Sequence, residues 1–365
     1  MRNALQIALS ALCAAALSGC MTMPPSTYQG SANGYNTALQ KTADEQLLLN
    51  LVRLKYRDTP YFMEASSFTA QFDFNTNASI GGAFPLSGDG TDVLNAGAGV
   101  SFSERPTIAF TPLQGEDFVS RLLQPVSFQT ISLLFNSGWS IDAVGRMVVQ
   151  RVNGVDNAPG ASGPTPKEAA TYVEFNRVSA LMFELQKTSM MQLGKGSSGE
   201  NEGGPALYLP QSGASAEADE IRELLGLDPA LNEYPVFAGT ASIRQENTGE
   251  IIINTRSLLG VFYYLSQGVE APAEHVKDGW VTRTLNADGS AFDWNQVLLD
   301  LFKVQVDSSR PSDAYVSTHY RGNWYSIPNS DLDTKASFTI LSQMFALETG
   351  DAMSQTPLLT IPISN

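Results

Sequence analysis

The most regular pattern of hydrophobic and polar positions lies between residues 67 and 102. Within residues 67–84, small or apolar residues alternate with mostly polar ones, which is typical of a β-strand. The alternation returns in residues 94–102, after a turn-like segment at 85–90. These runs predict one long antiparallel hairpin with an apolar and a polar face. The apolar face is expected to hold Phe68, Ala70, Phe72, Phe74, Thr76, Ala78, Ile80, Gly82, Phe84, Leu94, Ala96, Ala98, Val100 and Phe102.

Two interpretations of this hairpin imply different functions. In the one that we favour from the sequence, its apolar face packs on helices and its polar face meets water. In the other, its tip enters the outer membrane and joins hairpins of other subunits, because backbone groups in lipid need hydrogen-bond partners. The first run exceeds the roughly 9 to 11 residues that a tilted strand needs to cross a bilayer. The tip, however, lacks the Trp and Tyr residues of a clear aromatic girdle.

Helical periodicity appears on both sides of the hairpin. Thr42 and Glu45 resemble a capping box, and a largely buried helix is expected to follow until Pro60. Thr165 and Glu168 similarly predict a helix start, with its end near residue 188. Further helices are expected at residues 116–123, 128–135 and 141–152, the last with Arg146 and Arg151 facing outward.

The C-terminal part combines strand and helix patterns. Residues 236–244 and 250–254 predict a hairpin, and residues 315–327 predict a strand broken at Gly322. Helices are expected at residues 256–267 and from a capping box at 330–333 to near Gly350, the latter with Leu332 and Leu347 inside, and a last strand at 358–363. Strands and helices without a regular βαβ repeat predict an α+β fold, with helices packed on antiparallel strands and one long amphipathic β-hairpin.

The patterns also predict a domain organisation. A Gly-, Ser- and Glu-rich stretch is the expected boundary between two lobes. The expected order is a signal peptide at 1–19, a poorly structured lipidated tether at 20–41, an N-terminal helical lobe with the hairpin at 42–193, a flexible linker at 194–214, and a C-terminal α+β lobe at 215–365.

One short run stands out as a candidate ligand or partner surface. Aromatic residues beside an arginine can stack on sugars or peptides through flat faces and cation–π contacts. The alternative is a strand whose rings pack on the last helix. The candidate residues are His319, Tyr320, Arg321, Trp324 and Tyr325.

Charge restricts the partners. The chain has 37 acidic and 22 basic side chains, a formal net charge of −15. Nucleic acid is therefore not expected, because phosphate binding needs a dense cationic face. The clustered cations Arg53, Lys55 and Arg57 are expected to form a solvated helix face.

The N-terminus carries a targeting pattern. Arg2 precedes an apolar run at residues 4–17, which is shorter than a typical transmembrane helix and is typical of a signal peptide. The segment Leu17-Ser18-Gly19-Cys20 resembles a bacterial lipobox. The resemblance implies cleavage before Cys20, lipidation of that cysteine and a bilayer as partner. Met21, in place of an aspartate, favours the outer membrane.

The cysteine count limits the chemistry of the folded part. Cys13 would leave with the signal peptide and Cys20 would carry lipid, so no thiol would remain. Disulfides, thiol catalysis and cysteine-bound zinc or iron–sulfur clusters are then excluded.

Catalytic patterns are sparse in this sequence. His275 and His319 are the two histidines, and neither belongs to a His-Glu-x-x-His motif. Acidic residues could supply a paired-carboxylate glycan hydrolase, but nothing in the sequence locates the pair. We therefore expect no catalytic residue, no metal and no cofactor.

Three segments resemble recurring blocks of an uncharacterised family of proteobacterial envelope lipoproteins. They are residues 47–62 (LLLNLVRLKYRDTPYF), 104–115 (ERPTIAFTPLQG) and 323–335 (NWYSIPNSDLDTK). This resemblance implies a shared architecture in the envelope, without an activity. The expected function is a lipid-anchored, non-catalytic envelope protein that binds an envelope protein or its own copies. The alternatives are an oligomeric outer-membrane pore or secretion subunit that contributes the hairpin, and a cell-wall or glycan hydrolase.

Overall fold

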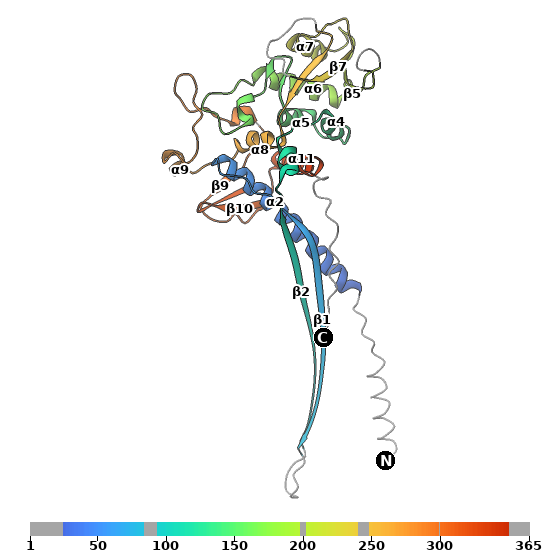
Figure 1. Cartoon of the computed structure of the whole chain (residues 1–365), viewed down its shortest axis with the longest axis vertical. Helices are drawn as coiled ribbons and strands as arrows, with labels where there is room; N and C mark the ends of the chain where they lie inside the picture. Colours follow the sequence, from blue (N-terminus) through green and yellow to red (C-terminus); the bar gives the residue numbers. More distant parts are fainter. Residues whose placement is uncertain (1–24, 84–92, 198–201, 240–247, 299, 350–365) are drawn as a thin grey trace. The chain divides into compact units, whose positions relative to one another are not determined.

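Short strands and helices alternate through most of the chain and form an α+β fold in the computed structural model (Figure 1). The fold class predicted from the sequence is therefore confirmed. The structure describes residues 25–83, 93–197, 202–239, 248–298 and 300–349. Cys20 and the whole predicted signal peptide lie outside these ranges, as does the predicted strand at residues 358–363.

The helices and strands follow one another in a mixed order. The helices are α2 (Pro25–Lys55), α3 (Glu116–Leu123), α4 (Phe128–Asn136), α5 (Ile141–Val148), the 3-10 helix η1 (Pro159–Ser162), α6 (Val173–Lys187), α7 (Ala216–Leu225), α8 (Leu258–Ser266), α9 (Ala273–Lys277), α10 (Asn295–Leu298) and α11 (Leu332–Thr349). The strands are β1 (Met63–Ala83), β2 (Val93–Pro112), β3 (Val149–Val152), β4 (Val155–Asp156), β5 (Gln192–Lys195), β6 (Pro205–Tyr208), β7 (Glu233–Ala238), β8 (Ile251–Thr255), β9 (Gln305–Asp307), β10 (Ala314–Tyr320) and β11 (Asn323–Pro328).

The chain divides into two compact units, Met1–Asp44 and Glu45–Asn365. In the first unit the described residues form the beginning of α2, where the sequence predicts a poorly structured tether at 20–41. Thr42 does not cap a helix: its Oγ1 donates to the carbonyl oxygen of Ala38 at 2.9 Å. Inside a helix a threonine hydroxyl commonly bonds to the carbonyl four residues earlier, so the apparent capping box lies in the helix interior.

The second unit contains a six-stranded sheet in the order β4-β3-β8-β7-β6-β5. β7 and β8 pair in parallel, with Val236 opposite Ile251, so the hairpin predicted for 236–244 and 250–254 is wrong. β5 and β6 form an antiparallel hairpin within the segment around the predicted linker at 194–214. Strands from both sides of this segment share one sheet, and residues 45–365 form a single unit where two lobes were expected.

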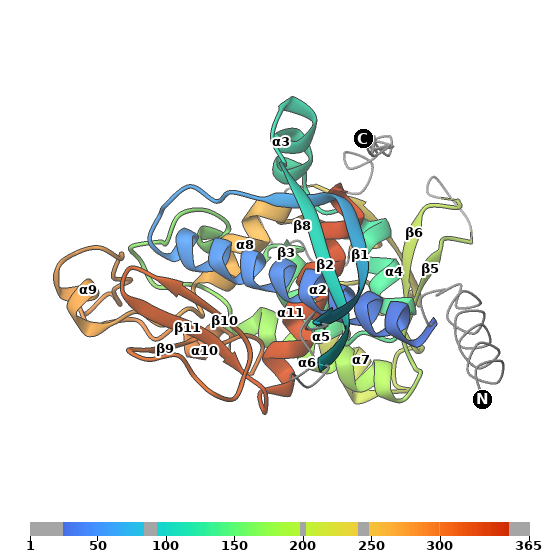
Figure 2. The ribbon, with the colours of Figure 1, turned by 90° about the horizontal axis from the view of Figure 1, so that it is seen from below.

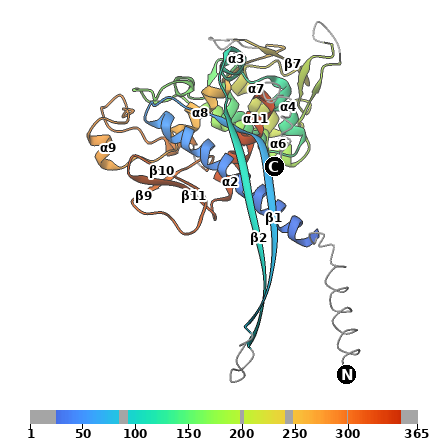
Figure 3. The ribbon, with the colours of Figure 1, turned by 60° about the horizontal axis from the view of Figure 1, so that its bottom comes forward.

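The long hairpin is confirmed as an antiparallel pair of β1 and β2 (Figure 1). Its register places Phe74 opposite Phe102 and Ala78 opposite Ala98. Opposed residues of an antiparallel pair lie on the same face, so the predicted apolar positions of both strands share one face. Figure 3 shows the two strands side by side again from another direction. Among the described strands, β1 and β2 pair with each other alone.

Aromatic packing holds the base of the hairpin. The backbone N–H of Leu113 donates to the carbonyl oxygen of Phe62 at 2.9 Å, directly beyond the last strand pair. The Phe62 ring is stacked on Phe345 at 5.0 Å and meets Phe262 edge-on at 5.4 Å. The strands therefore leave the core from an aromatic cluster that includes residues of α8 and α11.

One local prediction fails because a distant segment competes for the same backbone groups. The helix expected at Thr165 begins at Val173 instead, since the Pro166 carbonyl accepts from Thr284 Oγ1 at 2.6 Å and Glu168 forms a bridge with Leu285. Side-chain exposure also differs from expectation. Leu332 and Leu347 are exposed, whereas Arg146 and Lys55 are buried.

A buried arginine bonds to the backbone at the end of α5. Arg256 is 1% exposed, and its Nη1 donates to the carbonyl oxygens of Arg146, Met147 and Val149 at 2.9 to 3.2 Å. Its guanidinium also lies 4.0 Å from the Tyr264 ring centre. These carbonyls belong to the C-terminal end of α5 and the start of β3, where a cation is favourable. Arg256 thus joins α8 to that helix end.

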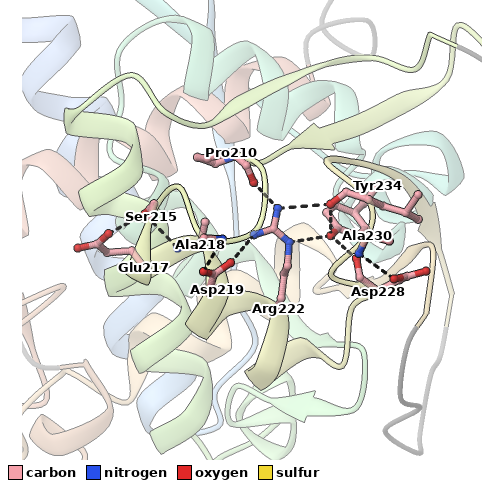
Figure 4. A network of polar contacts seen from close by, with 11 residues as sticks. Pro210, Ser215, Glu217, Ala218, Asp219, Arg222, Asp228, Ala230 and Tyr234 are labelled. Carbon is pink, nitrogen blue, oxygen red and sulfur yellow. Dashed lines mark hydrogen bonds and ion pairs between the residues drawn. The ribbon is translucent and has the colours of Figure 1, made fainter.

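A second arginine network fixes α7 against β7 (Figure 4). Arg222 Nε donates to the hydroxyl oxygen of Tyr234 at 2.9 Å, and its Nη1 lies 3.0 Å from Asp219 Oδ1. Arg222 Nη2 donates to the carbonyl oxygen of Pro210. Ser215 caps α7 by accepting from the N–H of Ala218. Arg222 is 3% exposed, and we assign this network a structural role.

Candidate functional site

The predicted candidate run at 319–325 forms the turn of the β10–β11 hairpin. Arg321 and Gly322 occupy the turn with φ angles of 48° and 82°. Two central residues with positive φ match the right-handed twist of flanking strands, and a glycine at the second position adopts such an angle easily. Figure 2 shows β10 and β11 side by side with β9. The candidate side chains therefore come from a short, well-defined hairpin.

The register divides the five predicted residues between the two faces of this hairpin. His319 lies opposite Trp324, with ring centroids 5.2 Å apart, and the guanidinium of Arg310 lies 5.1 Å from the Trp324 ring. Thr318 lies opposite Tyr325, so Tyr320 and Tyr325 fall on the other face. The structure consequently does not unite all five residues in one site.

Tyr56 connects the second face to two distant segments. Its hydroxyl oxygen lies 2.6 Å from Tyr325 Oη and 2.6 Å from His275 Nδ1. The exposed fractions of Tyr56, His275 and Tyr325 are 5%, 7% and 0%. This buried chain of three rings lies at the end of α2, in α9 and in β11. The sequence pattern did not single out Tyr56, nor did it connect His275 to the run.

An arginine and an acid lie beside this buried chain. Tyr320 Oη donates to Asp58 Oδ2 at 2.5 Å, and Arg321 Nη2 donates to the same oxygen at 2.9 Å. The Arg321 guanidinium lies 5.1 Å from the Tyr56 ring centre and 5.6 Å from that of Trp280. Arg321 is therefore held by one carboxylate and by aromatic rings, in a geometry that favours cation–π attraction.

Trp280 completes the exposed side of the cluster. It stacks on His275 with ring centroids 4.4 Å apart and an interplanar angle of 28°. Trp280 is 46% exposed, and the side chains of Arg321 and Asp58 are 37% and 34% exposed. We call Asp58, Trp280, Tyr320 and Arg321 the aromatic–arginine surface.

The electrostatics of this cluster favour fixed protonation states near neutral pH. Burial raises the pKa of the Tyr325 hydroxyl, and its bond with Tyr56 raises it further. Burial also raises the pKa of Tyr56, and the hydrogen bond with Tyr325 offsets only part of this rise. Burial opposes ionisation of Asp58, but hydrogen bonds from Tyr320 and Arg321 lower its pKa overall. The phenols thus stay neutral and Asp58 stays charged.

These protonation states determine what the cluster can do. Both buried phenols can donate hydrogen bonds but cannot act as bases near neutral pH. The exposed groups present a planar cation, a tryptophan and a tyrosine. Trp, Tyr and Arg are the residues enriched at the energetic centres of protein interfaces. The arrangement accordingly suits binding of a partner more than proton transfer.

An apolar cavity of about 80 Å³ lies elsewhere, between helices α4 to α6 and the six-stranded sheet. Its lining includes Ile131, Val178, Met182 and Ile253. The Ser179 hydroxyl is the one polar side-chain group among the described lining residues. Such a cavity lacks the convergent polar groups that orient a substrate.

Two negative findings concern the described part of the chain. Within the ranges that the structure describes, no three His, Cys, Asp or Glu side chains are grouped so that they could hold a metal ion. Among the same residues, no helix combines the length and the apolar character needed to cross a membrane. Cys20, the predicted lipidation site, lies outside them.

Comparisons with known proteins return no relative. No protein-family description matches the chain. No curated protein matches its sequence, and no solved structure matches its fold. The function therefore has to be inferred from the chemistry of this chain and its geometry alone.

Proposed function

We propose that this protein is a lipid-anchored, non-catalytic component of an outer-membrane assembly, which it joins through the β1–β2 hairpin. The lipobox-like segment ending at Cys20 supports the anchor. A lipoprotein anchor has several acyl chains, which hold a protein to a bilayer far more durably than a single chain does. The aromatic–arginine surface is a second place where a partner protein can bind.

The observation that carries this proposal is the isolation of the hairpin. Its strands contain 21 and 20 residues, and among the described strands neither has a partner outside the pair. A two-stranded sheet is at best marginally stable in water, and long unpaired edges act as templates for further strands. Partner strands from another chain would satisfy both edges, so the hairpin has the form of an assembly device.

Deletion of the outer part of the hairpin tests this function. The full chain is expressed in a Gram-negative host, extracted in mild detergent, and sized by light scattering with and without residues 75–95. We expect the intact protein to form a larger species and the deletion variant to be monomeric. The thermal unfolding midpoint of the rest of the protein should change little, because the strand residues that are deleted pair only with residues of the same hairpin. A monomeric intact protein would count against the proposal.

Two further variants separate the possible contacts. Trp280→Ala alters the aromatic–arginine surface and leaves the hairpin intact. If this variant stays assembled while the deletion variant does not, the hairpin is the contact. Cys20→Ser should remove the acyl mass from the purified protein. An unmodified Cys20 in the intact protein would overturn the anchored part of the proposal.

A further inference from the structure

The outer part of the hairpin contains a band without charged residues. Residues 74–83 of β1 and 93–102 of β2 contain no Asp, Glu, Lys or Arg. The register pairs these two segments end to end, from Phe74 opposite Phe102 to Ala83 opposite Val93. Charged residues occur within two positions of the base of the band, at Asp73 and Glu104, and they occur again in the connecting segment at residues 89 and 92. The band is thus bounded by charge at both ends.

The length of this band matches a bilayer. Ten residues of each strand lie within it, at about 3.3 Å per residue. A strand tilted by about 45° needs roughly 9 to 11 residues to cross the hydrocarbon core. In a hairpin that served only as a spacer in water, nothing would exclude charged residues from this length of both strands.

The two faces of the band differ in the way that a membrane sheet requires. One face contains the positions Phe74, Thr76, Ala78, Ile80, Gly82, Leu94, Ala96, Ala98, Val100 and Phe102. Most positions of the other face are Asn, Ser or Gly: Asn75, Asn77, Ser79, Gly81, Asn95, Gly97, Gly99 and Ser101. Strands that separate lipid from water alternate apolar and polar positions in this manner.

Strand edges without a hydrogen-bonded partner are unstable in hydrocarbon. Each unpaired backbone N–H or C=O group in lipid costs several kcal/mol, so a membrane-inserted sheet has to close on itself. One hairpin cannot do this, but identical hairpins can, because the β1 edge of one copy can pair with the β2 edge of the next. The band lies at the same level on both strands of each hairpin, so such pairing keeps it level around the ring.

We infer that the hairpins of several copies of this chain join edge to edge into a closed transmembrane sheet. The uncharged band of each hairpin crosses the hydrocarbon, the apolar face meets lipid, and the Asn- and Ser-rich face lines an aqueous pore. This inference rests on the proposed assembly function, and it identifies the partner as the chain itself.

Adjacent positions on opposite faces give a matched test. Ala78 and Ser79 lie near the middle of the band, on the lipid-facing and pore-facing sides. Purified full-length protein is reconstituted into planar bilayers of phosphatidylethanolamine and phosphatidylglycerol, and conductance is recorded. We expect the unaltered protein to conduct, Ser79→Arg to conduct with selectivity shifted toward anions, and Ala78→Arg to lose at least tenfold in conductance. An arginine on the lipid face near the bilayer midplane is costly, whereas one on the pore side stays hydrated.

Single-cysteine labelling tests the same two faces without depending on the folding of the arginine variants. In a Cys13→Ser background, Cys20 is acylated in this proposal, so one added cysteine is the sole free thiol. A fluorophore at position 76, 78 or 80 should be quenched by brominated lipid, and one at 75, 77 or 79 by aqueous iodide. Aqueous quenching at all six positions would overturn membrane insertion.

The outcomes distinguish this inference from the function beneath it. If the protein assembles in detergent but does not conduct, and Ala78→Arg behaves as Ser79→Arg does, the insertion is wrong and the assembly function stands. If the intact protein is monomeric and deletion of residues 75–95 changes nothing, both fail.

Discussion

The hydroxyl of Tyr56 lies 2.6 Å from that of Tyr325, although 269 positions separate them in the sequence. The same Tyr56 oxygen lies 2.6 Å from His275 Nδ1. One atom therefore joins the end of α2 to β11 and to α9. This oxygen is buried, so its partners cannot turn to water when it is removed.

Removal of this hydroxyl should destabilise the protein. We expect Tyr56→Phe to lower the free energy of unfolding by about 2 kcal/mol, because two buried polar groups lose their shared partner. Urea denaturation followed by circular dichroism measures the effect. Tyr320→Phe is the matched control, since its hydroxyl bonds to the partly exposed Asp58 and should cost less. Equal losses in the two variants would contradict the assigned role of Tyr56.

Arg256 should stabilise the fold by bonding to the C-terminal end of α5. In Arg256→Met the carbonyl oxygens of Arg146, Met147 and Val149 lose a buried donor. We expect a loss of about 3 kcal/mol or more in the free energy of unfolding, measured by urea titration. Arg177→Ala removes an exposed ion pair with Glu220 and should leave the midpoint unchanged within error. A similar midpoint for the two variants would argue against the structural role of Arg256.

Lys55 should make stability depend on pH in an alkaline window. Burial lowers its pKa from 10.5 to about 8, while its Nζ donates to the Gln267 carbonyl oxygen at 3.2 Å. Between these two pH values the unfolded chain binds more protons than the folded one, so stability attributable to Lys55 rises with pH. Between pH 7 and pH 10.5, the free energy of unfolding of the unaltered protein should therefore rise relative to that of Lys55→Met by up to about 3 kcal/mol.

Comparison with Lys55→Met isolates this residue from other groups. Tyrosines also titrate in the alkaline range, but they do so in both proteins. Parallel stability curves from pH 7 to pH 10.5 would show that Lys55 keeps its ordinary pKa in the folded state.

Gly268 should tolerate no side chain. A Cβ atom there would overlap the Phe302 carbonyl oxygen and approach Leu298 Cδ1 to 2.9 Å. We expect Gly268→Ala to lower the thermal unfolding midpoint, with a cost of about 1 to 3 kcal/mol from overpacking. Gly163→Ala is the control, because a Cβ atom at that position would meet nothing within 4 Å and the φ angle there is −136°. A smaller effect at Gly268 than at Gly163 would contradict this packing.

Some elements could be predicted because their signal is local. The alternation in residues 67–102 specifies both strands and both faces of the hairpin, and the observed register brings the two apolar sets together. The run at 319–325 likewise contains its own turn at Arg321 and Gly322. In both places the pattern and the turn lie within one continuous segment, and no distant residue is needed to define them.

Other predictions failed where pairing is decided at a distance. The strand patterns at β7 and β8 are local, but their parallel pairing is not, since β8 also pairs with β3 from a remote segment. The capping signal at Thr165 was overruled by the bond between Thr284 and Pro166. A local propensity is worth about 1 kcal/mol, which several long-range hydrogen bonds and buried contacts easily exceed.

The order of neighbouring residues is enough to predict the α+β class, the amphipathic hairpin and the aromatic run with Arg321. The folded chain is needed to see that Tyr56 and His275 meet Tyr325, that Lys55 and Arg256 are buried, and that β7 runs parallel to β8. The physical reason is that burial and side-chain contact depend on how distant segments fold together. Periodicity assigns a residue to a face but does not identify what that face meets.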